Sequence, residues 1–561
     1  MKNQTTLVAT LTLSMLASSV AFAAPVAPDA GQTIRELQPL PEMIAPGVVS
    51  PLQSAEPAQV EAVVSAAEEV TVDVTAIHVT GSRGYLAADL EALVADLVGS
   101  EHTLPELEAA AARITAFYRS QGYVVAQAYL PQQDIVDGSV TINVLEGALG
   151  QTLINNQSRL SDARATADAA TVKTGDAVQA EPVDRMLLLL SDTIGVGGVR
   201  ASLQPGASVG TTDLLIELDP AKPYAASVEV DNYGNRYTGE NRIGGSIALN
   251  SPLKMGDQLT LRAVASDLNM QYAQLSYRMP VGVDGLKVGV SFSDTTYKLG
   301  KEFAPLLADG TATSASVFAT YPLIRSQMSN LYGTLTYENK KLTDKTGGGV
   351  NTTNKTVDMV SLGLSGNHMD ALLGGGMSAY DATFTSGNLS MDAASMAVDA
   401  ASARSNGAFT KVGYNLNRQQ HMTAKDTVSL AFSGQQTDSN LASSEKMYLG
   451  GVNAVRAYPQ GEAGGDDGWL MNAEVRHTLM DKVQGVAFYD AGSVSLNHNA
   501  YVAGAVNTRS LAGAGVGVNA QYGWAQLKTS VAWRTTGGAP QSIPSTVNSS
   551  PMIWAQLAGQ L

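Results

Sequence analysis

A regular alternation of apolar and polar residues dominates the chain from residue 221 to its end. The stretch at 286–292 is typical, because every second residue there is apolar: Leu286, Val288, Val290 and Phe292. Strands that face lipid on one side and a wet lumen on the other have this period. Divided among about 16 strands, residues 221–561 give roughly 21 residues each, enough for a membrane-spanning strand and its turn. The pattern predicts an all-β transmembrane barrel of about 16 antiparallel strands. A large soluble β-sandwich or solenoid is the less favoured alternative, because no short internal repeat is visible.

The pattern is different between residues 72 and 220, where short strands alternate with amphipathic helices. The first half, 72–147, predicts the order strand, helix, helix, strand, strand, at 72–79, 86–97, 104–119, 123–130 and 139–145. The second half, 148–220, repeats this order less clearly, with a helix at 182–192 and strands at 199–203 and 213–218. The simplest interpretation is two tandem α+β modules, 72–147 and 148–220.

The first 71 residues contain a predicted signal peptide and a Pro-rich segment. Residues 1–23 combine Lys2, an apolar run and small residues before a cleavage point after Ala23. Within the following segment, 24–71, a helix is predicted at 29–38. Asp29 is its candidate N-cap, and Pro39 stops it. Its residues Ile34 and Leu37 share one face, so this short helix either docks elsewhere in the chain or is disordered.

Composition and charge exclude several classes of function. Lys and Arg total 35 against 51 Asp and Glu, a net charge of −16 that argues against a generally basic nucleic-acid binder. Only 15 % of the residues are charged, below the roughly 25 % of soluble proteins. The sequence has no Cys, which excludes disulfides, thiolate metal sites and a lipid-modified Cys anchor. Six scattered His residues without an H-E-x-x-H motif argue against a zinc enzyme, and we expect no cofactor.

Four stretches of the mature chain carry recognisable motifs. They are the helix at 29–37, the strand motifs at 122–134 and 137–147, the hairpin motif that begins at 230–234, and the loop motif at 450–459 with its partner strands at 468–476 and 488–492. Together they resemble the outer-membrane transporters of two-partner secretion (TpsB type), the family of haemolysin secretion/activation and filamentous-haemagglutinin transporters. The barrels of this family are related to the barrel-assembly insertases.

The resemblance implies an arrangement and a location for each part of the chain. The resemblance implies that the helix at 29–38 plugs the barrel, with Ile34, Arg35 and Leu37 as its characteristic residues. The two modules become polypeptide-transport-associated (POTRA) modules in the periplasm, and the barrel lies in the outer membrane of a Gram-negative bacterium. The sequence departs from the family at Ala457, where the loop motif usually has Gly, and at Leu561, where the last residue is commonly Phe.

The loop motif supplies the principal candidate site. By the resemblance, the loop around Arg456 and Tyr458 folds into the lumen. On the strands that follow, alternation places Glu474 on one inward face and Asp490 with Gly492 on another, because a carboxylate is costly in lipid. A guanidinium binds carboxylates in bidentate fashion, so we expect Arg456 to pair with Glu474 and Asp490 and to act as a latch coupled to transport. The alternative is a brace that only stabilises the barrel. The Gly-rich stretch at 461–468 lacks EF-hand spacing and predicts a flexible turn.

The paired modules predict a polypeptide ligand. A strand edge can bind an extended client by strand addition with little sequence dependence. We expect the client-binding side chains at and just after the predicted strand 123–130, namely Tyr123, Tyr129, Leu130 and Asp134.

The leading hypothesis is an outer-membrane polypeptide translocator that secretes a large unfolded partner protein, such as a haemolysin, adhesin or contact-dependent toxin. Because the terminal strand still alternates at Ile553, Ala555 and Leu557, we also expect assembly by the barrel-assembly machinery. We expect a monomer, and the acidic charge balance argues against a nucleic-acid partner. An assembly factor or insertase is the main alternative, although insertases usually have more POTRA modules than residues 72–220 can hold. A passive porin does not explain the modules or the plug. A barrel enzyme would need an acid/base set that the sequence does not offer.

Overall fold

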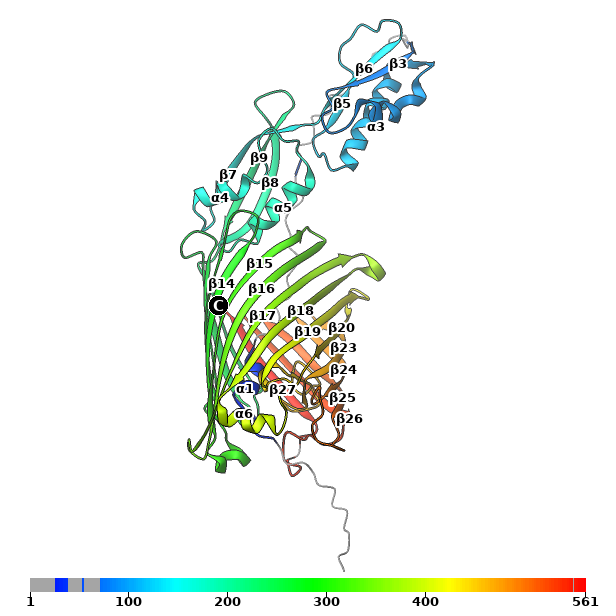
Figure 1. Cartoon of the computed structure of the whole chain (residues 1–561). Coiled ribbons are helices and arrows are strands. Elements are labelled where there is room, and N and C mark those ends of the chain that lie inside the picture. The colour runs from blue at the N-terminus through cyan, green and yellow to red at the C-terminus, as the bar shows by residue number, and fades with distance from the viewer. Residues whose placement is uncertain (1–25, 39–52, 55–70, 548) are drawn as a thin grey trace, which may run out of the picture.

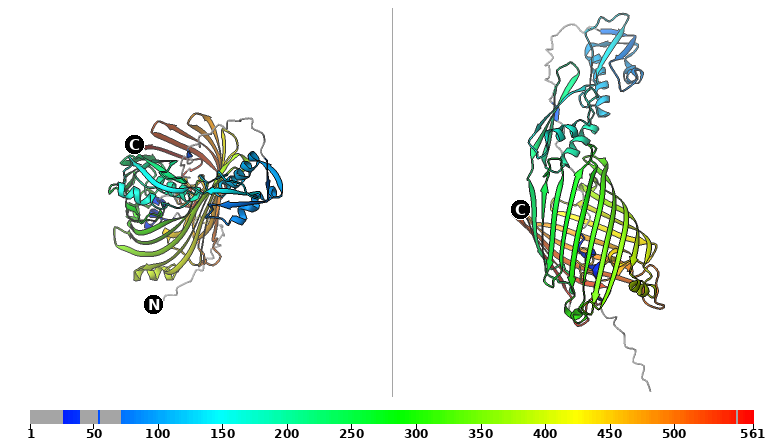
Figure 2. Two further views of the ribbon diagram at one scale, coloured as in Figure 1. Left: turned by 90° about the horizontal axis from the view of Figure 1, so that it is seen from above. Right: turned by 60° about the vertical axis from the view of Figure 1, so that its left-hand side comes forward.

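The computed structural model describes residues 26–38, 53–54, 71–547 and 549–561. Figures 1 and 2 show a large barrel, two small modules stacked above one rim of it, and the helix α1 inside the barrel. The predicted signal peptide and most of the Pro-rich linker lie outside the described residues. Within the described part of the chain, no helix is both long and apolar enough to cross a membrane.

The barrel is closed and consists of 16 antiparallel strands, each paired with its neighbour in sequence order apart from the short β21 and β22. The strands are β10 (Tyr224–Asp231), β11 (Arg242–Asn250), β12 (Gln258–Ser266), β13 (Gln271–Pro280), β14 (Lys287–Lys298), β15 (Asp309–Arg325), β16 (Ser329–Thr346), β17 (Asn351–Asp370), β18 (Gly376–Met391), β19 (Gly407–His421), β20 (Asp426–Thr437), β23 (Asp467–Met480), β24 (Val483–Ser495), β25 (Thr508–Tyr522), β26 (Ala525–Thr536) and β27 (Met552–Gln560). The barrel closes between β10 and β27, where the pairing extends only over Ser227–Asp231 and Gln556–Gln560. The sequence prediction of about 16 strands is confirmed.

The alternation that predicted the barrel sets the direction of its side chains. In β14, for example, Val290 and Phe292 are about half exposed on the outside of the wall. Their neighbour Ser293 is buried toward the interior. The strands differ greatly in length, from 8 residues in β10 to 20 in β17.

The first module contains two small sheets and two helices. One sheet pairs β2 (Thr71–Val74) with β4 (Ser100–Thr103), and the other has the order β3 (Ala76–Thr80), β6 (Ser139–Leu145), β5 (Gln127–Tyr129). The helical elements are α2 (Ala87–Glu91), which continues as the 3-10 helix η1 (Ala92–Leu97), and α3 (Leu104–Ser120). A capping box of Thr103 and Glu106 begins α3. The predicted strand at 123–130 is wrong in its first half, because only Gln127–Tyr129 is extended in the sheet.

The second module has a sheet of order β8 (Val196–Pro205), β9 (Thr211–Pro220), β7 (Ala148–Asn156), with the helices α4 (Asp162–Ala169) and α5 (Ala180–Ser191). The sequence did not predict β7 and α4. The two linker residues β1 (Gln53–Ser54) add to this sheet in parallel, next to β8.

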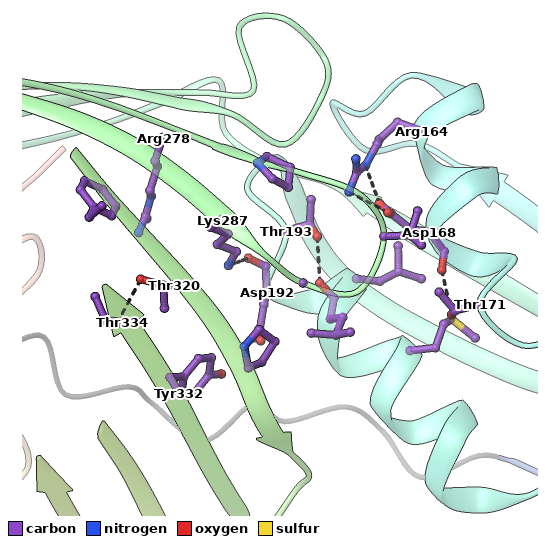
Figure 3. Close-up of a pocket in the computed structure, with 18 of the residues that line it drawn as sticks. Arg164, Asp168, Thr171, Asp192, Thr193, Arg278, Lys287, Thr320, Tyr332 and Thr334 are labelled. Atoms are coloured by element: carbon purple, nitrogen blue, oxygen red, sulfur yellow. Dashed lines mark hydrogen bonds and ion pairs between the residues drawn. The ribbon is translucent and has the colours of Figure 1, made fainter. Parts of the chain in front are cut away.

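The second module rests on the barrel rim through a buried ion pair. Arg325 lies at the end of β15, and Asp192 directly follows α5. The Nε and Nη2 atoms of Arg325 each donate to the Asp192 carboxylate at 2.7 Å. Nearby, Arg185 donates to the backbone carbonyl of Pro322 at 2.9 Å. Between the module and the inner wall lies a cavity of 490 Å³, in which Arg278, Lys287 and Tyr332 of the barrel face Asp192 and Thr193 (Figure 3).

The remaining elements lie in the loops between barrel strands. They are η2 (Lys301–Leu306), η3 (Leu372–Gly374), α6 (Ala393–Ala400), η4 (Ser443–Glu445), β21 (Met447–Tyr448) and β22 (Gly464–Gly465).

Candidate functional site: the lumenal loop and the plug helix

The long connection between β20 and β23 folds back against the inner wall of the barrel. Two glycines of the loop motif make its tight course possible. A Cβ on Gly450 would lie 2.3 Å from the Pro459 carbonyl oxygen and 2.4 Å from Glu462 Cβ. Gly451 has φ +129°, in the left-handed region that favours glycine. The loop therefore presents its next residues to β23 and β24.

Arg456 lies at the centre of this contact and joins two strands. Its Nε and Nη2 atoms donate to the Asp490 carboxylate at 2.8 and 2.7 Å, and its Nη1 donates to Glu474 at 2.6 Å. The backbone N–H of Arg456 also donates to Asp490, at 3.1 Å. The Asp490 residue is fully buried. The structure thus contains both ion pairs that the family resemblance and strand alternation together predict, and their role in transport stays a prediction.

Neighbouring side chains fix the guanidinium in place. Its central carbon lies 3.4 Å from the ring centroid of Phe488, in cation–π contact. Asn472 donates to Asp490 at 2.8 Å and to the Ala454 carbonyl at 2.9 Å. The indole of Trp554, on the last strand, donates to the Arg456 carbonyl at 2.7 Å. The loop is therefore tied to three strands of the wall.

Three further residues of the motif act through shape. The Tyr458 hydroxyl lies 2.8 Å from the Thr536 carbonyl oxygen, and the residue is fully buried. Gly492 leaves room for the loop, because a Cβ there would lie 2.7 Å from a methyl carbon of Leu449. Ala457, the departure from the family motif, is not among the residues with positive φ. It packs on Gly513, where a Cβ would approach Ala457 Cβ to 2.3 Å. A methyl group is thus accommodated by a glycine on the wall.

The helix α1 (Ala30–Leu37) lies inside the barrel with its apolar face buried. Ala30, Ile34 and Leu37 pack in one cluster with inner-wall residues such as Tyr237 and Tyr297. The helix ends at Leu37, and the Arg262 guanidinium donates to the Leu37 carbonyl at 3.2 Å. The predicted helix is confirmed, and of the two sequence-based alternatives the structure shows docking.

Polar contacts hold the other end of α1. The carboxylate of Asp29 caps the helix by accepting from the Gln32 N–H at 2.9 Å, and it accepts from the Ser443 hydroxyl at 2.6 Å. The backbone N–H of Ala30 donates to Asp344 on β16 at 2.7 Å. Both ends of the plug are therefore bonded to the wall or to η4.

The lumenal loop and the plug also touch each other, which the sequence did not predict. Gly461, with φ +82°, lies against α1: a Cβ there would lie 2.2 Å from the side-chain nitrogen of Gln32 and 2.6 Å from Glu36. Asn235 bridges the two, donating to Glu36 and to the Gln460 carbonyl at 3.2 Å each. The stretch 461–468, predicted as a flexible turn, is packed inside the barrel: Glu462 and Asp466 are fully buried, and Gly464–Gly465 forms the short strand β22.

A second buried ion cluster lies near the C-terminal end of the plug. Glu445 of η4 accepts from Lys340 on β16 at 2.8 Å and from Lys411 on β19 at 2.7 Å. Arg35 of α1 and the three charged residues line one cavity of 310 Å³. The Arg35 side chain itself donates to Gln38 at 2.9 Å.

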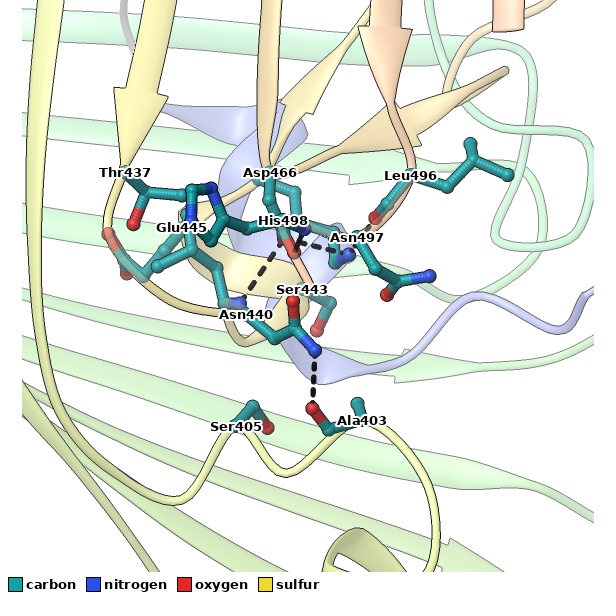
Figure 4. Close-up of polar contacts among 12 residues, drawn as sticks. Ala403, Ser405, Thr437, Asn440, Ser443, Glu445, Asp466, Leu496, Asn497 and His498 are labelled. Atoms are coloured by element: carbon teal, nitrogen blue, oxygen red, sulfur yellow. Dashed lines mark hydrogen bonds and ion pairs between the residues drawn. The ribbon is translucent and has the colours of Figure 1, made fainter. Parts of the chain in front are cut away.

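Asn440 joins three loops beyond the N-terminal end of the plug (Figure 4). Its side-chain nitrogen donates to the Ala403 carbonyl at 2.6 Å, and its oxygen accepts from the Asn499 N–H at 2.7 Å. The buried Asp466 accepts from the Leu441 and His498 N–H groups at 3.2 and 2.9 Å. These bonds order the segment that carries Ser443, the partner of Asp29.

The expected client-binding residues of the first module are not all accessible. Tyr123 is 7 % exposed and packs edge-to-face on Tyr118, with ring centroids 5.2 Å apart, so its side chain is not accessible to a client as the prediction requires. The cause is a contact with a distant segment: after Gly122 the chain turns, and Tyr123 bridges Gln179 of the second module. Tyr129 is half-buried and bonded to Asn143, Leu130 packs on the module core, and Asp134 is exposed.

Known proteins share both the sequence pattern and the fold. A family model described as haemolysin secretion/activation protein ShlB/FhaC/HecB matches residues 210–520, and a ShlB-type POTRA domain model matches 72–147. The chain is 30 % identical over 413 residues to the heme/hemopexin transporter protein HuxB of Haemophilus influenzae (strain 86-028NP), covering 72 % of each chain. It is 24 % identical over 465 residues to the outer membrane transporter CdiB of Dickeya dadantii (strain 3937), covering 79 % of each.

Solved structures support the same architecture. CdiB from Escherichia coli superposes with a TM-score of 0.72 at 18 % identity, covering 95 % of this chain and 96 % of that chain. BamA from Haemophilus ducreyi lacking POTRA domains 1-3 gives a TM-score of 0.51 at 15 % identity, covering 87 % and 100 %. At these identities the structures show a shared fold.

The family model covers more than half of the residues, and the relative from Haemophilus influenzae covers more than two thirds. This chain therefore belongs to the haemolysin secretion/activation protein family ShlB/FhaC/HecB, the outer-membrane transporters of two-partner secretion.

Proposed function

We propose that this chain secretes one large, unfolded partner protein from the periplasm through its barrel. The proposal is carried by the position of α1. The helix lies inside a closed barrel and is hydrogen-bonded to the wall at both ends, and because these contacts are non-covalent it can separate from the wall. A pore with a removable plug suits intermittent passage of a large substrate. The POTRA-type modules at the same pore supply a place where an exported polypeptide can bind first.

The chain's own residues suggest how passage is controlled. In the resting barrel, α1 and the loop around Gly461 lie in the lumen in contact with each other, and the proposal is that the plug leaves before a client enters. The Arg456 contacts keep the loop against β23 and β24 while α1 moves, because they do not involve the helix. Transport, not catalysis, is the proposed activity. The partner's folding outside the cell is the proposed source of energy.

The proposal names a class of cargo. Two relatives carry the names heme/hemopexin transporter protein HuxB and hemolysin transporter protein ShlB, and they are 30 % and 24 % identical to this chain. A large exported polypeptide, such as a haemolysin, adhesin, toxin or haem-acquisition protein, is the common expectation. We also propose that the chain works as a monomer inserted by the barrel-assembly machinery, without cofactor or nucleic acid.

The test is secretion of the large protein encoded beside this gene, with the intact chain and with residues 72–220 deleted. The proposal expects the partner in the medium only with the intact chain, while other outer-membrane proteins keep their normal levels. If the partner is secreted without these residues and other barrels are depleted, the proposal is wrong and the assembly-factor alternative takes its place.

A further inference from the structure

The cavity of 490 Å³ between the second module and the inner wall of the barrel, here called the joint cavity, is lined by both carboxylates and cations (Figure 3). Its first carboxylate, Asp168, forms an ion pair with Arg164 at 2.8 Å. The second, Asp192, accepts from Arg325 through both of its oxygens. Both carboxylates of the lining are therefore already paired with an arginine.

The cation of the cavity that lies on β13, Arg278, is not paired in this way. Within the described part of the chain its Nε–H is fully buried and has no hydrogen-bond partner, and no carboxylate forms an ion pair with its guanidinium. The neighbouring Lys287, on β14, donates to the backbone carbonyl of Asp192 at 3.1 Å. A buried donor without a partner is costly and rare in folded proteins. The Arg278 guanidinium is therefore the group of this cavity that can accept an anion.

The strand register places apolar surface beside this guanidinium. Arg278 lies opposite Gly289 on β14, and Gly289 lies opposite Phe318 on β15. A Cβ on Gly289 would lie 2.4 Å from the Cζ atom of Phe318, so the glycine leaves room for the ring on the inner wall. On the module side, Leu189 and Leu190 of α5 also line the cavity. The lining thus combines one available cation with an apolar surface.

The size of the joint cavity suits a small molecule rather than a single ion. A water molecule occupies about 30 Å³, whereas sites for small organic ligands run from about 300 to 1,000 Å³. The cavity of 310 Å³ beside the plug differs in its charges, because Lys340 and Lys411 both donate to Glu445 there.

We infer that the joint cavity binds a small organic anion, with its carboxylate or phosphate group on Arg278 and its apolar part against Phe318 and the leucines of α5. The planar fork of a guanidinium matches both kinds of anion. The inference goes beyond the proposed function, because this ligand is not the secreted client.

Such a ligand would also stabilise the joint between the second module and the barrel, because it contacts the wall and α5 together. A ligand that binds only the closed joint lowers the open population by the factor 1 + [L]/Kd. At a ligand concentration of about ten times Kd, hydrogen exchange of the α5 amides through opening of the joint should slow by about tenfold.

The test is calorimetric titration of the full-length barrel in non-ionic detergent with butyl phosphate and with butyrate. The inference expects saturable binding of at least one of the two, and their comparison distinguishes phosphate from carboxylate. Butan-1-ol, which lacks the charge, and inorganic phosphate, which lacks the apolar part, should each bind at least about tenfold more weakly. Binding of butan-1-ol as tight as that of either anion would overturn the inference.

Two variants and a control assign the binding to the cavity. Arg278→Gln should weaken binding at least about tenfold and abolish the slower exchange of α5. Thr320→Phe keeps the cation but fills part of the cavity, so it should also weaken binding, and it serves as the test if Arg278→Gln does not fold. Arg200→Gln removes the same charge from an exposed ion pair outside the cavity and should bind as the wild type does. The inference is wrong if neither anion binds the wild type, or if the folded cavity variants bind as tightly as the control.

Discussion

Replacement of Arg456 by Ala would leave the buried carboxylate of Asp490 without its cation, while Glu474 would keep its contact with Arg476. The substitution removes the three guanidinium hydrogen bonds, at 2.6–2.8 Å, to the fully buried Asp490 and to Glu474. Breaking a buried ion pair by removing one partner costs about 3–5 kcal/mol. At 1.4 kcal/mol per tenfold, even about 3 kcal/mol shifts the loop's docking equilibrium by more than about 100-fold. We therefore expect Arg456→Ala to detach the loop from β23 and β24.

The assay is partner secretion normalised to the amount of folded barrel in the outer membrane. A latch coupled to transport predicts a large loss of secretion at a normal barrel level. A brace that only stabilises the barrel predicts less folded barrel and unchanged secretion per barrel. Arg476→Ala is the matched control, because Arg476 contacts the same Glu474 from a side chain that is 33 % exposed.

A double substitution separates the effect of losing the Arg456 guanidinium from the effect of leaving the Asp490 carboxylate buried without a cation. Asp490→Asn removes the buried charge, so in combination with Arg456→Ala it should recover barrel stability but not secretion. The latch hypothesis is refuted if Arg456→Ala barrels are present at normal levels and secrete as the wild type does.

Three further outcomes test other contacts. Gly461→Ala should raise single-channel conductance toward that of a chain without residues 24–40, because the added Cβ would collide with Gln32 of the plug. The control Gly504→Ala should leave conductance unchanged, because Gly504 also has positive φ, +75°, but a Cβ there would have no atom within 4 Å. Equal conductance of the two variants would contradict the plug contact. Arg325→Ala should loosen the second module, since Arg325 is buried and its loss removes both guanidinium hydrogen bonds to the Asp192 carboxylate, at a cost near the lower end of about 3–5 kcal/mol. Faster amide hydrogen exchange in α5 would measure this, and Arg200→Ala, in an exposed ion pair, should cost less than about 1 kcal/mol. Thr103→Ala should cost the N-terminus of α3 about 1 kcal/mol. The Thr103 N–H and His102 hold the pKa of Glu106 below its ordinary value, so the stability that this carboxylate contributes is present above its unfolded-state pKa and is lost as the pH falls. Protection factors of the α3 amides, corrected for the intrinsic exchange rate at each pH, should fall at acidic pH, and unchanged protection factors would contradict this.

Local pattern was sufficient for those parts of the molecule in which side chains alternate or repeat regularly between two environments. Period-2 alternation predicted the barrel and the inward direction of Glu474 and Asp490, because a strand in a membrane wall has only two faces. The helix predicted at 104–119 is confirmed, because α3 runs from Leu104 to Ser120.

The missed features depend on contacts between distant segments or on weak local signals. The helix α4 buries only small side chains such as Ala165 and Ala169, so it has no apolar stripe to detect. Tyr123 alternates like a strand residue, yet contact with the second module takes it out of the sheet. The contacts of Gly461 with α1, and of Glu445 with Lys340 and Lys411, join residues far apart in the chain. No local periodicity encodes such contacts.

The unequal strand lengths have a consequence for the surrounding lipid. At about 3.3 Å per residue and a tilt of about 40°, a strand of 8 residues such as β10 has an axial height of roughly 20 Å, whereas the 20 residues of β17 reach roughly 50 Å. The apolar band of outer-membrane barrels is about 25 Å tall. The wall beside the β10–β27 closure is therefore shorter than the hydrocarbon layer. Acyl chains there must shorten or tilt to meet it, so the thinnest bilayer lies where the barrel pairing is also shortest.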